Sequence, residues 1–372
     1  MDFQQTVGGA LLAFALTWAA VRALMPWAAR LGLLDHPTGR KAHERPTPVI
    51  GGPAMLLAVL VTLMLPFGTP GQATIGFVLA AALLTFMGII DDRIDISWRV
   101  RIVVQIAAAL LLIYVGGIRI EHVGNLLGFG SFELGPWSVP FTVFATVGVI
   151  NAINMIDGED GLAGTQVLAA LLMLCAAALY SGNAVVLQRA AVIAGAVAGF
   201  LVFNLRLPGR GPARIFMGNA GSAFLGLVIA CFTFRLTQNP AHPVGPILAL
   251  WLIPVPIMDC LVLMVRRLRS GRSPFAADRG HIHHLMARAG YQPFGIVTSL
   301  AGFSFATGLG AAIALRLQVP HVLLALAFVL LCLGYYWLTS RHERTVTFLR
   351  WLRRGNEQRP SGDLVESKEP GH

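Results

Sequence analysis

The sequence predicts an all-α integral membrane protein, a polytopic helical bundle of about 11 transmembrane helices. Of its 372 residues, 56% are hydrophobic and only 12% are charged, about half the ~25% charged residues of soluble domains. The apolar residues also gather into runs long enough for membrane-spanning helices, which need ~20 of them each. A soluble fold of this length has too little interior to bury so many apolar side chains.

Each predicted span is an apolar run separated from the next by a polar or Gly/Pro-containing connection. The runs start near Val7, Ile50, Ala73, Val103, Pro140, Leu162, Val185, Ala223, Val244, Phe294 and Val322. The first run lacks a small-residue cleavage site after a short apolar core, so we interpret it as an anchor rather than a removed signal peptide. An odd number of spans places the two termini on opposite sides of the membrane.

Two segments do not have the pattern of spans. Residues 117–139 alternate partially between apolar and polar residues around glycines, which predicts a small extracytoplasmic β-hairpin. Residues 341–354 mix aromatic and aliphatic residues with five arginines, which predicts a basic amphipathic helix on the inner leaflet. We therefore expect a transmembrane domain over 1–340 and a cytoplasmic region over 341–372, whose end has a disordered composition.

The net charge of +10 is distributed very unevenly along the chain. Of the 28 basic residues, 23 lie in alternate connections, at 30–48, 91–101, 205–221, 266–292 and 341–372. Only four lie at the others, and the last, Arg22, lies late in the first span. Because basic loops stay in the cytoplasm, the N-terminus is expected outside and the C-terminus inside. The charge thus indicates orientation in a lipid bilayer and not nucleic-acid binding. The four cysteines lack CxxC spacing, so neither disulfides nor a zinc site is predicted.

Four aspartates lie at the predicted cytoplasmic ends of two spans. Asp91 and Asp92 occur in GIIDDRIDIS, and Asp157 and Asp160 occur in NAINMIDGEDGLAG. Carboxylates at such positions are functional candidates, and neighbouring carboxylates repel one another unless a cation lies between them. Oxygen ligands without cysteine favour Mg²⁺ or Mn²⁺. The structural alternative is that these carboxylates cap helices or pair with nearby arginines.

Two asparagines precede Asp157 at helical spacing. Asn151 and Asn154 are six and three residues before it, which places all three on roughly one helix face. Such amides are suited to recognising a nucleobase or a sugar, and they are equally suited to hydrogen bonding between helices. Further along, residues 206–222 (RLPGRGPARIFMGNAGS) place glycines and arginines just before a span, a pattern compatible with an anion at a helix N-terminus.

Basic side chains and histidines gather in two cytoplasmic connections. His281, His283 and His284 follow an arginine-rich stretch that includes Arg267. Zinc is disfavoured there because no carboxylate or cysteine completes a ligand set and the arginines repel a cation, so we predict phosphate binding. The first connection offers similar chemistry at Lys41, His43 and Arg45, although positive-inside bias alone also explains them. Carboxylates for a metal and cations for phosphates together favour phosphoryl transfer to a membrane-resident acceptor.

The chain resembles the polyprenyl-phosphate N-acetylhexosamine-1-phosphate transferases. The matching blocks are RKAHERPTPVIGG (40–52), DDRIDISWRVRIVVQ (91–105), NAINMIDGEDGLAG (151–164), FNLR and RIFMGNAGSAFLG (203–226), and the segment from PVPIMDC to HHLMARAG (254–290). The HIHH form is closer to the N-acetylglucosamine-1-phosphate branch than to the muramoyl-pentapeptide branch. The resemblance implies a multi-pass protein of the bacterial inner membrane.

The resemblance also implies a reaction and roles for individual residues. N-acetylglucosamine (GlcNAc) 1-phosphate would pass from UDP-GlcNAc to undecaprenyl phosphate on the cytoplasmic face, releasing UMP and initiating an envelope polysaccharide such as O-antigen, common antigen or teichoic acid. Asp91, Asp92 and Asp157 would be catalytic, and Asp92, Asp157 and Asn219 would hold Mg²⁺ or Mn²⁺. Asn151, Asn154, Asp160 and Asn204 would bind the nucleotide or sugar, and Lys41, His43, Arg45, Arg267, His281, His283 and His284 the phosphates.

One position departs from the family pattern. The glycine loop usually reads MGDxGS, whereas here Asn219 replaces the aspartate. We expect Asn219 to ligate the metal through its carbonyl oxygen, with weaker Mg²⁺ binding. In the mechanism we expect, Asp91 takes any proton from the lipid phosphate, which attacks the phosphorus nearer the sugar. Double displacement through a phospho-aspartate is the alternative.

Three other functions remain open from the sequence. The same chemistry could use UDP-MurNAc-pentapeptide or another UDP-HexNAc. A secondary transporter would want charges near mid-membrane and broken helices, whereas here the acidic residues lie at one face. The third possibility is a catalytically inactive relative that serves as a scaffold, and only Asn219 suggests it. A homodimer is also left open.

Overall fold

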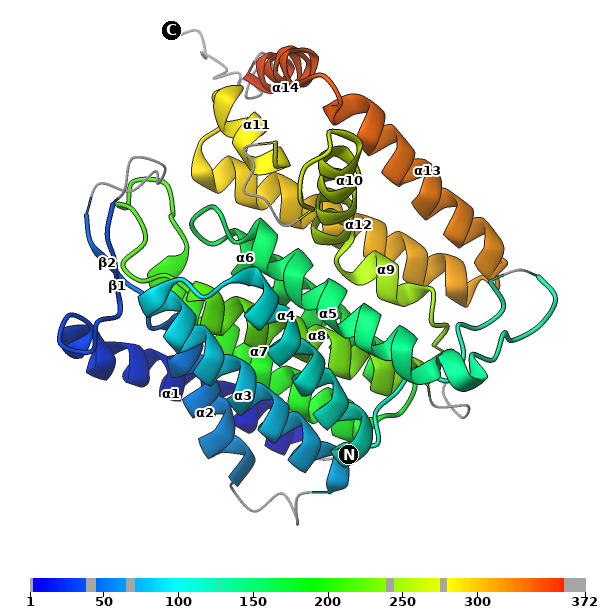
Figure 1. Cartoon of the computed structure of the whole chain (residues 1–372), viewed down its shortest axis with the longest axis horizontal. Coiled ribbons are helices and arrows are strands. Elements are labelled where there is room, and N and C mark those ends of the chain that lie inside the picture. The colour runs from blue at the N-terminus through cyan, green and yellow to red at the C-terminus, as the bar shows by residue number, and fades with distance from the viewer. Residues whose placement is uncertain are drawn as a thin grey trace, which may run out of the picture.

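The computed structural model describes residues 3–37, 45–64, 71–126, 128–238, 244–274 and 280–357 (Figure 1). Its first eight α-helices are α1 (Phe3–Leu24), α2 (Gly51–Met64), α3 (Gln72–Ile94), α4 (Trp98–Leu110), α5 (Ser138–Ile156), α6 (Leu162–Tyr180), α7 (Ala184–Asn204) and α8 (Gly218–Thr237). The others are α9 (Leu248–Leu252), α10 (Pro254–Arg269), α11 (Ile282–Arg288), α12 (Pro293–Arg316), α13 (His321–Thr339) and α14 (His342–Glu357).

The protein is a polytopic helical membrane protein, as the sequence predicts. Within the described ranges, nine helices are long and apolar enough to cross a membrane. Two of the predicted spans form shorter helices. The run near Ile50 forms α2, which has 14 residues, and the run near Val244 is divided at Ile253 into α9 and α10. Pro254 and Pro256 lack the N–H that would continue the helical ladder through this break.

Extended structure is scarce in the described part of the chain. The one sheet there pairs β1 (Leu34–Asp35) with β2 (Thr47–Pro48), next to α1 and α2. The hairpin predicted at 117–139 is not confirmed, since the described residues of this segment contain a single antiparallel bridge, His122 to Glu133. Positive φ angles at Gly124, Gly128 and Gly130 turn the backbone repeatedly, which leaves no regular ladder.

Helix α8 is the centre of the bundle. Most of its side chains from Ala220 to Thr237 are buried, and it packs against α3 and α5. Glycines allow close approach at these crossings. A Cβ atom on Gly88 of α3 would lie 2.3 Å from the Cα of Ala220, and one on Gly226 would lie 2.5 Å from the Cα of Ile150 in α5. These crossings hold the ends of α3, α5 and α8 together.

A second group of helices covers one side of this bundle. Helices α10, α12 and α13 lie to the upper right in Figure 1, and α10 and α12 contact α5 and α6 respectively. Helix α14 follows α13 and packs against α11. Its buried face includes Val346 and Leu349, whereas Trp351 is 68% exposed. The amphipathic helix predicted near 341–354 is therefore present.

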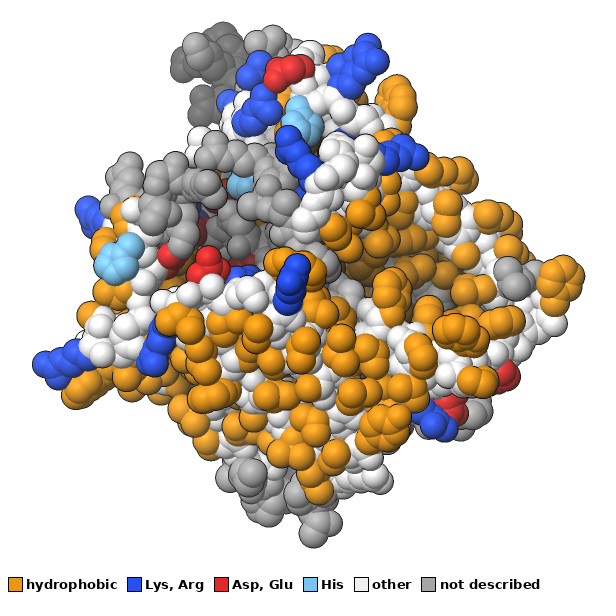
Figure 2. Space-filling view, viewed as in Figure 1, with side chains coloured by type: hydrophobic (Ala, Val, Ile, Leu, Met, Phe, Trp, Pro, Cys, Tyr) orange, Lys and Arg blue, Asp and Glu red, His pale blue; other side chains and the backbone are white. Residues whose placement is uncertain are grey.

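The outer surface matches a protein embedded in lipid. Figure 2 shows hydrophobic side chains over the face formed by α3, α4 and α5, while acidic side chains gather at the upper left, beyond the end of this apolar face. The exposed side chains of this apolar band on α3, α4 and α5 include Phe86, Val103 and Phe144. In water such a surface would be unfavourable, so this band is the lipid-facing part of the chain.

Candidate functional site

A cavity of about 2150 Å³ opens at the end of the bundle where α3, α5 and α7 end and α8 begins. Connections that are far apart in sequence meet there, which confirms that the predicted aspartates share one face. Of the predicted site residues, those lining it are Arg45, Asp91, Asp92, Asn154, Asp157, Asp160, Asn204, Asn219 and His284. Lys41 and His43 lie outside the described residues.

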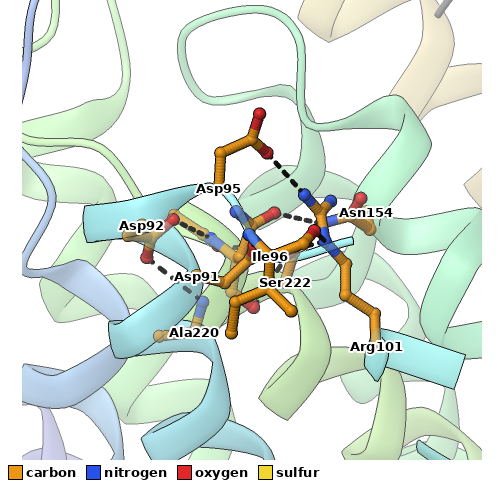
Figure 3. Close-up of polar contacts among 10 residues, drawn as sticks. Asp91, Asp92, Asp95, Ile96, Arg101, Asn154, Ala220 and Ser222 are labelled. Atoms are coloured by element: carbon orange, nitrogen blue, oxygen red, sulfur yellow. Dashed lines mark hydrogen bonds and ion pairs between the residues drawn. The ribbon is translucent and has the colours of Figure 1, made fainter. Parts of the chain in front are cut away.

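Asp92 closes the N-terminus of α8. Its Oδ1 accepts a hydrogen bond from the backbone N–H of Asn219 at 2.9 Å, and its Oδ2 lies 3.4 Å from the N–H of Ala220 (Figure 3). The first N–H groups of a helix have no partner within the helix and attract negative charge. Gly88, one turn before Asp92, permits the backbone contact that brings the carboxylate to this position. Asp92 thereby joins α3 to α8 at the cavity wall.

Asp91, its neighbour, is tied to a different element. The Asp91 carboxylate is buried and lies 3.0 Å from Nε of Arg101 in α4, while its Oδ1 accepts the Ile96 N–H at 2.7 Å. Arg101 also bonds Asp95 at 2.8 Å (Figure 3). The alternative in which a carboxylate pairs with a nearby arginine is therefore realised at Asp91. Because Arg101 and Ile96 already engage the Asp91 carboxylate, this geometry gives no support to the proton-acceptor role, which remains a prediction.

The two asparagines of α5 have different surroundings. Asn154 donates from Nδ2 to Oδ1 of Asn219 at 3.0 Å and to Oγ of Ser222 at 2.8 Å, which joins α5 to α8 within the cavity. Asn151 instead donates to Gln105 of α4 at 2.7 Å and is not part of the cavity wall. Hydrogen bonding between helices, the alternative reading, thus describes Asn151.

Asp157 differs from the other described carboxylates of the site in its lack of side-chain partners and in how far its pKa is raised. It directly follows α5, and its side chain forms no hydrogen bond or ion pair with any described residue. Burial, together with the negative charges of Asp92 and Asp160, raises the pKa of Asp157 from 3.8 to about 7. An ionised Asp157 is therefore unfavourable unless a cation compensates for this repulsion.

Asp160 and Asn204 organise the loops around the cavity. Oδ2 of Asp160 accepts the Ala213 N–H at 3.0 Å. Asn204 is buried, and its amide bonds both the Gly161 N–H, at 3.0 Å, and the Ile215 carbonyl, at 2.9 Å. Both residues thus hold the loop before α6 against the loop before α8. Nucleotide or sugar contact by either remains a prediction.

The three histidines form one cluster with unequal access to the cavity. Their ring centroids lie 4.2 to 6.2 Å apart, and only His284 is part of the cavity wall. His283 is buried against Gly158, and burial together with its histidine neighbours lowers its pKa to about 3. A neutral imidazole cannot neutralise a phosphate, so the role predicted for His283 does not suit this geometry.

Arg267 also lies away from the cavity wall. Its side chain is buried in α10, and its Nη1 donates to the Pro274 carbonyl at 2.7 Å. This bond fixes the turn after the helix, so phosphate binding by Arg267 remains a prediction without support from the geometry.

Several lining residues were not among those assigned by sequence. Arg206, Arg210 and Arg214 approach the cavity from the connection before α8, where only their position upstream of a glycine loop had marked them. Glu159 is a further lining carboxylate, and burial together with Asp160 raises its pKa. It lies in the GEDG turn between the two predicted aspartates, and this position in the sequence could have marked it as a site residue.

The donor set partly fits a divalent cation. Asp157 is a carboxylate without a partner beside other carboxylates, and Asp92 and the Asn219 carbonyl supply further oxygen atoms in the same cavity. Among the described residues, however, no three His, Cys, Asp or Glu side chains converge into a preassembled metal site. The residues thus suit an oxygen-bound cation that a bound diphosphate helps to hold.

Fold and site together define a polytopic membrane enzyme of the phosphoryl-transfer type, with carboxylates and arginines around a cavity at one end of the bundle. Comparison with known proteins agrees. The model of glycosyl transferase family 4 matches residues 74–237, and the chain belongs to this family.

Three relatives carry the description undecaprenyl-phosphate alpha-N-acetylglucosaminyl 1-phosphate transferase. The protein from Escherichia coli O157:H7 is 32% identical over 88% of this chain and 89% of its own length. The Salmonella typhimurium protein is 33% identical over 90% and 92%, and the Haemophilus influenzae protein is 34% identical over 91% and 94%.

Proposed function

We propose that this protein transfers GlcNAc-1-phosphate from UDP-GlcNAc to undecaprenyl phosphate, giving undecaprenyl-diphospho-GlcNAc and UMP. The supporting observation is the cavity itself, which joins Asp92, Asp157 and Asn219 to the arginines before α8 at one end of a membrane bundle. The named relatives, which align over about nine tenths of the chain, support the same acceptor and sugar.

The charge distribution suits a diphosphate donor. Arg206, Arg210 and Arg214 lie on the cavity wall where they can neutralise phosphate oxygens. The N-terminus of α8 adds partial positive charge, which Asp92 balances. In the transferring step a phosphate oxygen of the lipid attacks the phosphorus attached to the sugar, and the bond from that phosphorus to UMP breaks. Positioning and charge neutralisation carry most of such a reaction.

No strong base is required for this step. A phosphate monoester has a second pKa near ~6, so the attacking oxygen is mostly ionised at neutral pH. The contacts of the Asp91 carboxylate with Arg101 and Ile96 are consistent with this, because they give Asp91 a structural role. We therefore assign Asp91 to holding α4 against the end of α3, a change from the proton-acceptor role expected from the sequence.

We propose that Asp92, Asp157 and Asn219 hold Mg²⁺ or Mn²⁺. When bound, such an ion neutralises the diphosphate and the leaving UMP. Asp157 is the best supported of the three, since it has no partner among the described residues and is repelled by two other carboxylates. Asn219 offers a neutral carbonyl oxygen and already accepts a hydrogen bond from Asn154.

We further propose that the cavity faces the cytoplasm of a bacterial inner membrane, with the N-terminus outside. The 23 basic residues of the alternate connections support this orientation. Helix α14 would then lie at the inner leaflet, with Trp351 and Phe348 exposed beside its arginines.

The choice of donor is tested by supplying purified protein with undecaprenyl phosphate, Mg²⁺ and one UDP-sugar at a time. We expect UMP release with UDP-GlcNAc and little with UDP-MurNAc-pentapeptide. Faster release with another donor would move the assignment to that sugar. Direct displacement predicts no exchange of labelled UMP into UDP-GlcNAc when the lipid is omitted, whereas a covalent enzyme intermediate would allow it.

A further inference from the structure

A buried carboxylate outside the cavity wall holds the first histidine of the cluster. Asp259 of α10 is only 1% exposed. Its Oδ2 lies 2.7 Å from Nδ1 of His281, and its Oδ1 accepts the Tyr335 hydroxyl at 2.5 Å and the Ile282 N–H at 3.3 Å. These donors come from the start of α11, with His281 directly before it, and from α13, so the carboxylate joins both helices to α10.

Such an arrangement is costly unless every partner is present. A buried carboxylate needs donors to replace its lost water, and Asp259 has three. Tyr335 and Ile282 provide neutral donors, which leaves the negative charge available to His281. A carboxylate on one ring nitrogen of a histidine fixes the tautomer and the direction of the other nitrogen, as carboxylates do behind metal-bound histidines.

The second ring nitrogen of His281 has a different environment. Nε2 forms no hydrogen bond with the described residues, yet it is not enclosed, in contrast with both nitrogens of His283. The His281 side chain is 9% exposed, and its ring centroid is 6.2 Å from that of His284, which lines the cavity. His281 is thus anchored on one edge and open on the other, beside the cavity.

We propose that Asp259 and Tyr335 are positioning residues, which hold His281 with Nδ1–H toward the buried carboxylate and direct Nε2 toward the diphosphate of the donor, to which Nε2 donates once it takes up a proton. This inference rests on the proposed function, because it names a phosphate-facing role at the same cavity. Helix α13 thereby contributes to the site although none of its residues is part of the cavity wall. Loss of the Tyr335 hydroxyl would leave Asp259 with one donor fewer, which weakens the hold on His281.

The kinetic test compares Asp259→Asn, His281→Gln, the double variant and Tyr335→Phe, with Tyr336→Phe as the matched control. Tyr336 is the neighbouring tyrosine, and its hydroxyl accepts from Arg269. We expect Asp259→Asn to lower kcat/KM for UDP-GlcNAc about 10- to 100-fold, by analogy with loss of the carboxylate behind a metal-bound histidine. Tyr335→Phe should give a smaller loss and Tyr336→Phe none, and Asp259→Glu should recover part of the rate.

Non-additivity separates positioning from a structural role. If Asp259 acts through His281, the double variant is no slower than His281→Gln alone. Independent, multiplying losses would overturn the proposal, as would full activity of His281→Gln. Should Asp259→Asn fail to fold, the Tyr335→Phe variant combined with His281→Gln applies the same criterion.

A measurement without turnover keeps this inference distinct from the proposed function. Histidine ¹⁵N chemical shifts, assigned through His281→Gln, report which ring nitrogen carries the proton at a pH of about 8.5, where free imidazole is neutral. We expect Nδ1–H at His281 in the wild type, and Nε2–H would contradict it. A wild-type protein that shows this tautomer but releases no UMP from UDP-GlcNAc would overturn the proposed function and with it the phosphate-facing role, while leaving the Asp259–His281 geometry intact.

Discussion

Replacing Asp157 with asparagine removes the charge that the cavity tolerates least. Asp157 has no partner among the described residues and lies near Asp92 and Asp160. Asparagine has nearly the same shape and imitates the protonated carboxyl group. The substitution therefore tests electrostatic repulsion with little change in packing.

The expected magnitude follows from the pKa of Asp157. A pKa raised from 3.8 in the unfolded chain to about 7 in the folded protein means that the folded state binds the proton more tightly. The associated stability is present below the unfolded pKa and is lost as pH rises through the folded pKa. The full loss corresponds to about 4 kcal/mol, of which about 2–3 kcal/mol develops between pH 5 and pH 8.

The assay is chemical unfolding in detergent with EDTA, at pH 5 and pH 8. We expect Asp157→Asn to be more stable than the wild type at pH 8. The difference in unfolding free energy between variant and wild type should be about 2–3 kcal/mol larger at pH 8 than at pH 5. Saturating Mg²⁺ should stabilise the wild type at pH 8 and not the variant. Asp95→Asn is the control, because the Asp95 side chain is 96% exposed. Identical pH dependence of wild type and Asp157→Asn would refute the repulsion argued for this site.

The remaining predictions concern packing, the metal and orientation. Gly88→Ala should destabilise the protein by more than about 3 kcal/mol in detergent unfolding, since the new Cβ would meet the backbone of α8. The control Gly148→Ala, whose new Cβ meets open space, should stay within about 1 kcal/mol of wild type. Equal effects of the two substitutions would exclude the close crossing of α3 and α8. Asn219→Asp should lower the Mg²⁺ concentration needed for half-maximal activity, and an unchanged requirement would remove Asn219 from the metal site. A green fluorescent protein fused after residue 372 should fluoresce in intact cells, and a dark fusion that is active as a phosphatase fusion would reverse the orientation.

Charge placement made the cavity predictable from sequence. In a chain with 18 acidic residues, Asp91, Asp92, Asp157 and Asp160 stood out because they end apolar runs on one side of the membrane. Helix ends on one side of a bundle are neighbours, so these side chains share one cavity. Their partners were less predictable from sequence: Asp91 forms an ion pair with Arg101, whereas Asp92 accepts a hydrogen bond from the N-terminus of α8.

Tertiary contacts account for what the sequence pattern did not indicate. Asp259 lies in an apolar run, and its hydroxyl partner is 76 residues further along the chain. Asn151 and Asn154 share a helix face, yet only Asn154 reaches the cavity, because Gln105 of a neighbouring helix binds Asn151. The region 117–139 alternates like a hairpin, but within its described residues the two arms are joined only around the bridge from His122 to Glu133, with positive-φ glycines between them. The outcomes at Asp259, Asn151 and Asn154 depend on neighbours that local sequence does not specify.

The most direct test is the stoichiometry of the reaction with purified protein, UDP-GlcNAc, undecaprenyl phosphate and Mg²⁺. We predict one UMP and one undecaprenyl-diphospho-GlcNAc for each UDP-GlcNAc consumed, with both products lost in Asp157→Asn. UMP without the lipid product, or undiminished turnover in Asp157→Asn, would contradict the assignment of this cavity to GlcNAc-1-phosphate transfer.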